Sequence, residues 1–319
     1  MTTNSGRVLL TDHPWPGAEI ETHLCAEAGY ELVDAPPRAS SSDLASLAVD
    51  VDGILTCWSQ VTRDVVEAST RLRVISRLGV GLDNIDLDAA REHHVTVTRV
   101  PDYCVEEVSD HALALILNWA RGISYFDRFL RSESQLAHSY PLRRVRDLVV
   151  GIWGAGHIGL RTASKISALG CTVLIDDHHP DHKADFTAVP IAELLSQSDV
   201  ISLHMPLTSS TKGLVNEGVF NQMKRGSLLV NTSRGALVDV DDLASGLDRG
   251  RPAAAALDVL PNGPHIPARL AGRDNVVITP HVAFSSSQSI QELRERATTN
   301  LVSALRGEPI EGAIGQPNV

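Results

Sequence analysis

The sequence has little of what nucleic-acid or membrane binding requires. Its 39 acidic residues outnumber its 28 Lys and Arg residues, which gives a net charge of −11, and no more than two basic residues stand next to each other. Contact with nucleic-acid phosphates needs a concentrated basic surface, so no nucleic-acid partner is expected. The longest apolar run, around 112–117, is too short to cross a bilayer, so no membrane association is expected either.

Cysteines are also scarce, and their spacing fits neither a metal site nor a redox pair. The polar start at 1–7 leads into a predicted strand and lacks the features of a signal peptide. The histidine-rich stretch 178–182 holds its side chains too close together, in a predicted loop, for a tidy metal site. We therefore expect a cytoplasmic protein without a metal, whose thiols are reduced: Cys25, Cys57, Cys104 and Cys171.

What the sequence does have is a long alternation of apolar strands and helices. The 319 residues, 43% of them apolar, are enough for two domains with a core each. In the first hundred residues the alternation predicts a parallel sheet with helices on its faces. The predicted strands are 7–11, 30–33, 53–56, 74–76 and 95–100, and the predicted helices are 18–28, 42–49, 62–69 and 87–93.

A helix at 105–121 follows that is apolar almost all round, so we expect it to be buried on several sides, between domains or between subunits. The alternation then restarts at 149. An amphipathic helix at 289–305 is expected to return to the first domain or to the domain junction. The six strands predicted in the second half are 149–153, 171–175, 199–204, 227–232, 254–259 and 275–279.

The most informative motif lies where the first of these strands ends. Gly154, Gly156 and Gly159 form Gly-x-Gly-x-x-Gly after a strand, with His157 and Ile158 inside the motif, and a predicted helix at 160–169 follows. The glycines permit a tight turn, close approach of a pyrophosphate and close helix packing, while the helix N-terminus attracts the phosphate charge. An acidic residue after the next strand can hydrogen-bond a ribose 2′-hydroxyl and would repel a 2′-phosphate, which favours NAD over NADP. We select Asp177 for that role rather than Asp176.

These observations predict an α/β protein with two doubly wound parallel-sheet domains. A Rossmann NAD-binding domain at 101–284 is inserted into a flavodoxin-like substrate domain made of 1–100 and 285–319.

Further polar segments stand at the strand ends of the second domain, where open α/β sheets bind ligands. They are 203–208, 231–235, 256–259 and 279–281. Arg234 is a permanent cation whose fork matches a carboxylate, and His281 is the natural proton donor and acceptor near neutral pH. This pair suits hydride transfer on a 2-oxo or 2-hydroxy acid.

The chain resembles the D-isomer-specific 2-hydroxyacid dehydrogenases over nearly its whole length. The resemblance rests on 77–86, 110–115, 154–159, 231–235 and 279–281, in the order that the family has them. Segments 100–107 and 291–296 look most like the branch that holds phosphoglycerate dehydrogenase and the C-terminal-binding-protein corepressors.

The resemblance implies roles for individual residues and a homodimer, which would explain the apolar helix at 105–121. Arg234 and His281 match the catalytic arginine and histidine, both at the substrate. Val80 and Gly81 match the loop that receives the substrate carboxylate, and Trp58 and Ser59 lie in a first-domain loop that would wall the pocket. Asp258 matches an acid that contacts the nicotinamide amide. The other positions matched along the cofactor are Cys104, Pro206, Thr211, Thr232 and Ser233.

One departure stands out. The family carries a catalytic glutamate five residues after the aspartate at 258, and this chain has Gly263 there. That glutamate holds the histidine tautomer and favours the protonated ring, so its loss should lower the pKa of His281 relative to an ordinary member. The site could work with a neutral His281, another group such as His265 or a distant carboxylate could fill the gap, or the substrate could release no hydroxyl proton.

The sequence therefore predicts an NAD-dependent dehydrogenase or reductase acting on the CH–OH group of a 2-hydroxy acid, or on a close analogue such as a phosphonate. Its partner would be a small anionic substrate. The loop 55–62 lacks the arginine expected for 3-phosphoglycerate. The alternative is a weakly catalytic NAD(H)-binding regulator similar to a corepressor, favoured by Gly263.

Overall fold

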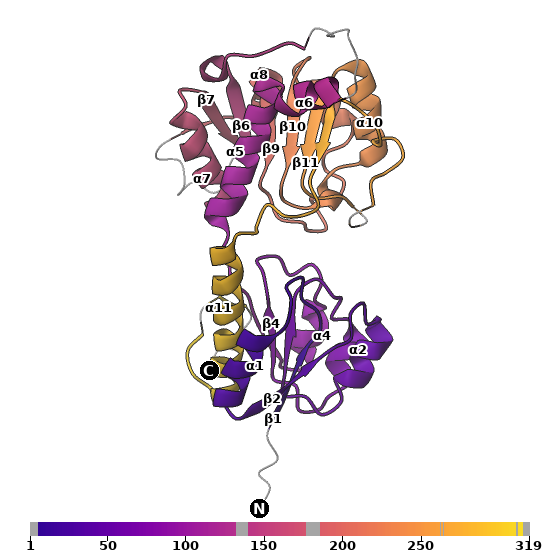
Figure 1. Ribbon diagram of the computed structural model, residues 1–319, viewed down its shortest axis with the longest axis vertical. Helices are drawn as coiled ribbons and strands as arrows, with labels where there is room; N and C mark the ends of the chain where they lie inside the picture. Colours follow the sequence, from indigo (N-terminus) through magenta and orange to yellow (C-terminus); the bar gives the residue numbers. More distant parts are fainter. Residues whose placement is uncertain are drawn as a thin grey trace, which may run out of the picture. The chain divides into compact units, whose positions relative to one another are not determined.

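The computed structural model describes residues 6–131, 140–176, 186–261, 263, 265–310 and 312–314. These form two compact units, Met1–Tyr103 with Ser286–Val319 and Cys104–Ser285. The chain passes between the units at 103/104 and 285/286, where the sequence placed the domain boundaries at 100/101 and 284/285. Each unit has its own sheet and core (Figure 1).

The first unit is a parallel sheet in the order β13-β5-β4-β3-β1-β2, in which β13 alone pairs antiparallel, with β5. The five parallel strands occur where the sequence predicts them, because short apolar runs bounded by turn residues are typical of buried strands. The strands are β1 (Gly6–Leu10), β2 (Tyr30–Asp34), β3 (Gly53–Thr56), β4 (Val74–Arg77), β5 (Thr96–Thr98) and β13 (Ala313–Ile314).

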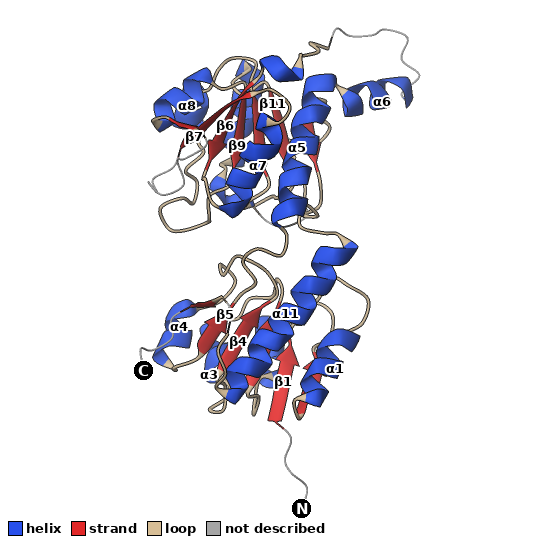
Figure 2. Cartoon of the chain, turned by 90° about the vertical axis from the view of Figure 1, so that its left-hand side faces the viewer, coloured by secondary structure: helices blue, strands red, loops and turns tan. Residues whose placement is uncertain are grey.

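Helices cover both faces of this sheet (Figure 2). The C-terminal helix α11 (Ser287–Arg306) packs with α1 (Glu19–Glu27) on one face, as expected for a helix that returns to the first domain. Its buried stripe of Leu293, Ala297, Leu301 and Leu305 faces β3 and β4. The remaining helices of the unit are α2 (Ser41–Leu47), α3 (Arg63–Glu67) and α4 (Leu87–Glu92).

The second unit is a seven-stranded parallel sheet in the order β12-β11-β10-β9-β6-β7-β8. The order reverses between β6 and β9, which makes the point between these strands the switch point where such sheets bind ligands. The sequence predicts six of the strands and misses the two-residue β8. The strands are β6 (Val149–Trp153), β7 (Thr172–Asp176), β8 (Thr187–Ala188), β9 (Val200–Leu203), β10 (Leu228–Asn231), β11 (Ala254–Leu257) and β12 (Val276–Ile278).

The helix predicted at 105–121 is present as α5 (Val105–Arg121) and packs against α7 (His157–Ser167), β10 and β11. Its opposite side is more open, because Leu113 and Leu117 are half-buried and Ala114 is exposed. The unit also contains α6 (Ile123–Arg131), α8 (Ile191–Gln197), α9 (Glu217–Gln222), α10 (Val240–Arg249), and short 3₁₀ turns at Val145–Asp147 and Gly235–Leu237.

Candidate active site

The turn between β6 and α7 needs its glycines for three different reasons. Gly154 has φ +103°, and a Cβ there would lie 2.7 Å from the backbone of His204 and Met205. A Cβ on Gly159 would overlap the carbonyl oxygen of Gly154, so this glycine lets α7 sit close to the strand. A Cβ on Gly156 would meet nothing within 4 Å. The space beside Gly156 is therefore open to a ligand.

The start of α7 fits the pyrophosphate of a dinucleotide. The helix begins at His157 after Gly156, an N-cap residue that has no side chain to cap the first turn. Gly156 and His157 are exposed and Ile158 is half-buried. The N–H groups of this turn and the positive end of the helix dipole are thus available to an anion. Asp177, predicted to bind the adenosine ribose, lies outside the described residues.

The loops after β9 and β10 continue this edge of the sheet. In the first loop, the Thr211 hydroxyl donates to the Pro206 carbonyl at 2.7 Å and so closes the turn that carries both predicted cofactor residues. In the second, the Ser233 hydroxyl donates to the Leu203 carbonyl at 2.9 Å, which joins the two loops. Within the part of the chain that the structure describes, the buried hydroxyl of Thr232 meets no hydrogen-bond partner. An unsatisfied buried hydroxyl is costly, and a cofactor amide would satisfy it.

The loop that carries Arg234 is held in place from both sides. Asn231 accepts the Ser233 N–H at 3.0 Å with its side-chain oxygen and donates its amide to the Arg234 carbonyl at 2.9 Å. A Cβ on Gly235 would overlap Leu260 and the nitrogen of Pro261. Gly235 therefore lets the loop after β10 press against the loop after β11. The half-buried Arg234 donates Nη1 to the Ser233 carbonyl at 2.9 Å.

His281 sits in a turn that Asp258 organises. His281 has φ +56°, a left-handed conformation that is uncommon outside glycine, although asparagine, aspartate and histidine adopt it more often than other residues. Its N–H donates to the Asp258 carbonyl at 2.8 Å and to the Thr279 carbonyl at 3.0 Å. The Asp258 carboxylate accepts the N–H groups of Val282 at 3.0 Å and Ala283 at 2.9 Å. The Asp258 side chain is fully enclosed, so holding this turn is a task that the sequence did not predict for it.

Register brings these loops to one edge. Asn231 pairs with Leu257, and Leu257 pairs with Ile278, so β10, β11 and β12 end level with one another. Neighbouring strands lie roughly 4.8 Å apart, which places the loops of Arg234 and His281 about 10 Å from each other. Two long side chains can reach a small substrate across such a span. Cys104, predicted near the nicotinamide, directly precedes α5 and is buried.

The first unit presents its own organised loop. The carboxylate of Asp12 accepts the N–H groups of Cys57, Trp58 and Ser59 at 2.8–3.1 Å. Trp58 is 45% exposed, whereas burial raises the pKa of Cys57 to about 12, so this thiol stays protonated. Asp12 is a positioning residue that the sequence analysis missed, although an acid directly after the first strand is a recognisable signal.

The segment predicted to receive the substrate carboxylate is shaped by a buried arginine. Arg77 donates Nε to the Asn84 side chain at 3.2 Å and Nη1 to the Leu78 carbonyl. The following residues, Val80 and Gly81, are half-buried. The backbone of this loop is therefore held in place by a cation that lies just behind it.

Gly263, at the position where the resemblance implies a glutamate, has a conformation of its own. It has φ +75°, and a Cβ there would meet nothing within 4 Å. The position has room for a side chain, but its backbone favours glycine. His265, the neutral substitute considered from the sequence, is exposed.

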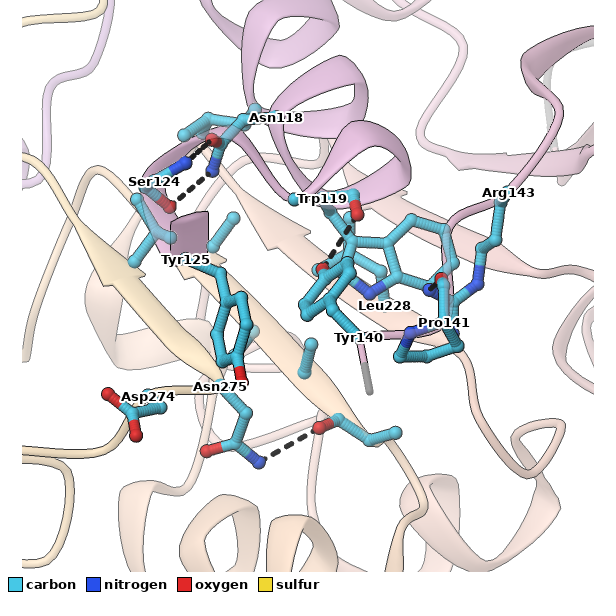
Figure 3. Close-up of a pocket in the computed structure, with 17 residues that line it drawn as sticks. Asn118, Trp119, Ser124, Tyr125, Tyr140, Pro141, Arg143, Leu228, Asp274 and Asn275 are labelled. Atoms are coloured by element: carbon cyan, nitrogen blue, oxygen red, sulfur yellow. Dashed lines mark hydrogen bonds between the residues drawn. The ribbon is translucent and has the colours of Figure 1, made fainter. Parts of the chain in front are cut away.

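A pocket of about 190 Å³ lies in the second unit at the opposite end of the sheet. Trp119 and Tyr125 line it together with Leu228, Asn275 and the short segment 253–256, which start β10, β12 and β11 (Figure 3). Arg234 and His281 follow the other ends of these strands, so this pocket is separate from the candidate active site.

No group of three or more His, Cys, Asp or Glu side chains is placed to hold a metal ion in the ranges given above. The histidine-rich stretch 178–182 falls outside them. Among the helices that the structure describes, none has the length and apolar character needed to span a membrane.

Comparison with known proteins identifies a family. Residues 113–283 match the model of the D-isomer specific 2-hydroxyacid dehydrogenase NAD-binding domain. A glyoxylate reductase of Thermofilum pendens is 33% identical over 92% of this chain and 90% of its own length. D-3-phosphoglycerate dehydrogenase 2 of Arabidopsis thaliana is 32% identical over 94% of this chain, which spans only 50% of that protein.

Solved structures agree as well. The D-lactate dehydrogenase of Aquifex aeolicus, in complex with NAD and lactic acid, is 28% identical with a TM-score of 0.84, over 94% of this chain and 96% of that one. A glyoxylate reductase of Paecilomyes thermophila is 26% identical with a TM-score of 0.88, over 98% and 99%. The two predicted parallel-sheet domains and the predicted NAD-binding domain are thereby confirmed, and the chain belongs to the D-isomer specific 2-hydroxyacid dehydrogenase family.

Proposed function

We propose that this chain is an NAD-dependent oxidoreductase that transfers a hydride between nicotinamide and a 2-hydroxy or 2-oxo acid, or a close analogue such as a phosphonate. The observation that carries the proposal is the level ending of β10, β11 and β12. Their loops present Arg234, Asp258 and His281 at the same sheet edge as the glycine turn of α7.

Each side chain has a distinct task in this proposal. NAD, when bound, supplies the hydride donor or acceptor. Arg234 pairs its guanidinium with the substrate carboxylate and polarises the reacting carbonyl. His281 gives a proton to the carbonyl oxygen during reduction and takes it from the hydroxyl during oxidation. Two hydrogen bonds hold the left-handed backbone of His281. They fix the position of its Cα, from which the imidazole ring extends.

We further propose that the site works without a carboxylate at position 263. Among the described residues, no atom beyond the chain neighbours would lie within 4 Å of a Cβ at Gly263. Loss of an adjacent anion lowers the pKa of an imidazole, so His281 should be less often protonated at neutral pH than in a member with glutamate. Reduction should therefore improve as the pH falls.

The substrate is proposed to be a small 2-oxo acid. The loop of Trp58 and Ser59 has no arginine to bind a phosphate group, and its tryptophan is largely exposed. Some relatives are named glyoxylate reductases, and they match this chain over most of their length. Glyoxylate and pyruvate are accordingly the first compounds to test.

The two units are proposed to share the work, the second holding NAD and the first the substrate. Four buried free cysteines fit a reducing, cytoplasmic location.

A homodimer is proposed through α6, whose Ile123 and Leu130 are 61% and 77% exposed and, with Phe126, follow helical spacing. Sedimentation of the wild type and of Leu130→Glu tests the dimer. A monomeric wild type would contradict it.

The catalytic proposal is tested by following NADH oxidation with a panel of 2-oxo acids between pH 5 and 9. Turnover should occur with at least one small acid and be lost in Arg234→Ala and His281→Ala, while both variants still bind NADH. Tight NADH binding without turnover on any acid at any pH would overturn the proposal and favour the NAD(H)-binding regulator.

A further inference from the structure

A continuous chain of hydrogen bonds links α5 to the turn of His281. His111, on α5, places Nε2 3.0 Å from the Thr279 hydroxyl and 3.7 Å from the Asp258 carboxylate. The Thr279 hydroxyl lies 2.5 Å from the same carboxylate oxygen. Asp258 then binds the two residues that follow His281 through their N–H groups. No sequence pattern indicates these hydrogen bonds, because the residues they join are up to 172 positions apart.

The direction of each bond follows from the chemistry of the groups. An ionised carboxylate only accepts, so the hydroxyl of Thr279 donates its proton to Asp258. The hydroxyl oxygen must then accept, so His111 carries a proton on Nε2. Every hydrogen bond in this series therefore donates in the direction from His111 to the Asp258 carboxylate. The neutral His111 ring must be the tautomer with its proton on Nε2.

Asp258 transmits this arrangement to the turn. Its carbonyl and its two carboxylate oxygens accept the N–H groups of three successive residues, His281, Val282 and Ala283. One residue thus determines the path of the whole turn. The rotamer of Asp258 is in turn fixed by the Thr279 hydroxyl, and the orientation of that hydroxyl is fixed by His111.

Burial makes the arrangement sensitive to each member. The side chain of Asp258 has no exposed surface and that of His111 is 23% exposed. A buried carboxylate that loses a donor has no water to replace it, so the carboxylate and the backbone it holds must shift. A shift of about 1 Å at a reacting group can cost on the order of 10²-fold in rate.

We propose that His111 and Thr279 are positioning residues for His281, acting through Asp258. The inference rests on the proposed function, in which His281 moves the substrate proton. It assigns to α5 and the Thr279 hydroxyl the task of orienting the catalytic imidazole.

Matched substitutions test the proposal in the full-length protein. Thr279→Val removes the hydroxyl at nearly constant shape, and Thr279→Ser keeps it. His111→Phe removes the ring donor, whereas His111→Gln keeps an N–H at a similar reach. We expect kcat to fall about 10- to 100-fold in the Val and Phe variants, with KM for NADH unchanged, and to recover to within about threefold in the Ser and Gln variants.

A double variant shows whether the two residues act as one chain. Thr279→Val combined with His111→Phe should be no slower than Thr279→Val alone by more than about threefold, because one break already disconnects the chain. Multiplying effects would overturn the proposal, as would equal losses in the Val and Ser variants, which would indicate a purely steric role.

A readout without substrate separates this inference from the proposed function. The ring protons of His281, assigned by their absence in His281→Ala, can be titrated by NMR in the wild type and in Thr279→Val. The titration midpoint should differ between the two proteins and be restored in Thr279→Ser. An unchanged midpoint would refute the positioning role even if the wild type turns over. A changed midpoint in a protein without turnover would support the positioning role while the proposed function fails.

Discussion

Replacing the three glycines of the β6–α7 turn one at a time separates folding from cofactor binding. Gly154→Ala must place a Cβ at φ +103° and 2.7 Å from the backbone of His204 and Met205. The left-handed conformation costs about 1–2 kcal/mol, and overpacking against backbone adds about 1–3 kcal/mol. We expect the free energy of unfolding to fall by about 2–5 kcal/mol.

Gly156→Ala should behave in the opposite way. Its backbone is extended, with φ −76°, and the new methyl group meets nothing within 4 Å. The free energy of unfolding should change by less than about 1 kcal/mol. The methyl group would nevertheless occupy the place proposed for the pyrophosphate, so the Kd for NADH should rise at least about tenfold, or about 1.4 kcal/mol.

The assays are urea denaturation followed by circular dichroism, and titration of NADH fluorescence. Gly226→Ala is the matched control, since it has φ +84° and open space but stands at the start of β10, away from the turn. It should lose about 1 kcal/mol of stability and bind NADH normally. If Gly156→Ala binds NADH as tightly as the wild type, the proposed pyrophosphate site is wrong.

Three further predictions concern charge. Glu21→Gln removes the carboxylate that pairs with buried Arg294 at 2.7 Å, and the free energy of unfolding measured in urea should fall by about 3–5 kcal/mol. The control Arg63→Gln, at an exposed ion pair, should leave this free energy unchanged. Equal losses in the two variants would contradict the role of burial. Burial lowers the pKa of His204 from 6.5 to about 4. As the pH falls, the imidazole of His204 is therefore protonated at a higher pH in the unfolded chain than in the folded protein. Stability should drop between pH 6.5 and 4 by at most about 3 kcal/mol, since part of the residue is accessible. His204→Gln should flatten that decline, and an unaltered slope would refute it. Gly263→Glu should raise reduction rates at neutral and higher pH, because a carboxylate favours protonated His281. Gly263→Gln is equally strained at φ +75° but carries no charge, so it should not raise them. Identical pH profiles of the two variants would show that the charge has no effect.

Much of the fold could be predicted because its signals are local. Apolar strands such as those at 149–153 and 254–259, and the glycine turn at 154, each carry their information within a few residues. The strand β8 was missed because two residues, Thr187 and Ala188, are too short to show a period.

The site was predictable only in part. Arg234 and His281 come shortly after strands that the sequence itself predicts, so their place at the ends of these strands could be predicted. The roles of Asp12 and of the link from His111 through Thr279 to Asp258 depend on contacts between distant segments. No periodicity or spacing reports such contacts, because they arise only when the sheet brings its loops together.

The central claim is that Arg234 and His281 promote hydride transfer to a small 2-oxo acid. Incubation with glyoxylate or pyruvate and NADH deuterated at the nicotinamide C4 tests it most directly, with products analysed by mass spectrometry and NMR. We expect a 2-hydroxy acid with deuterium on C2 from the wild type, and none from His281→Ala or Arg234→Ala. Equal deuterium transfer by His281→Ala, or none by a wild type that binds NADH, would contradict it.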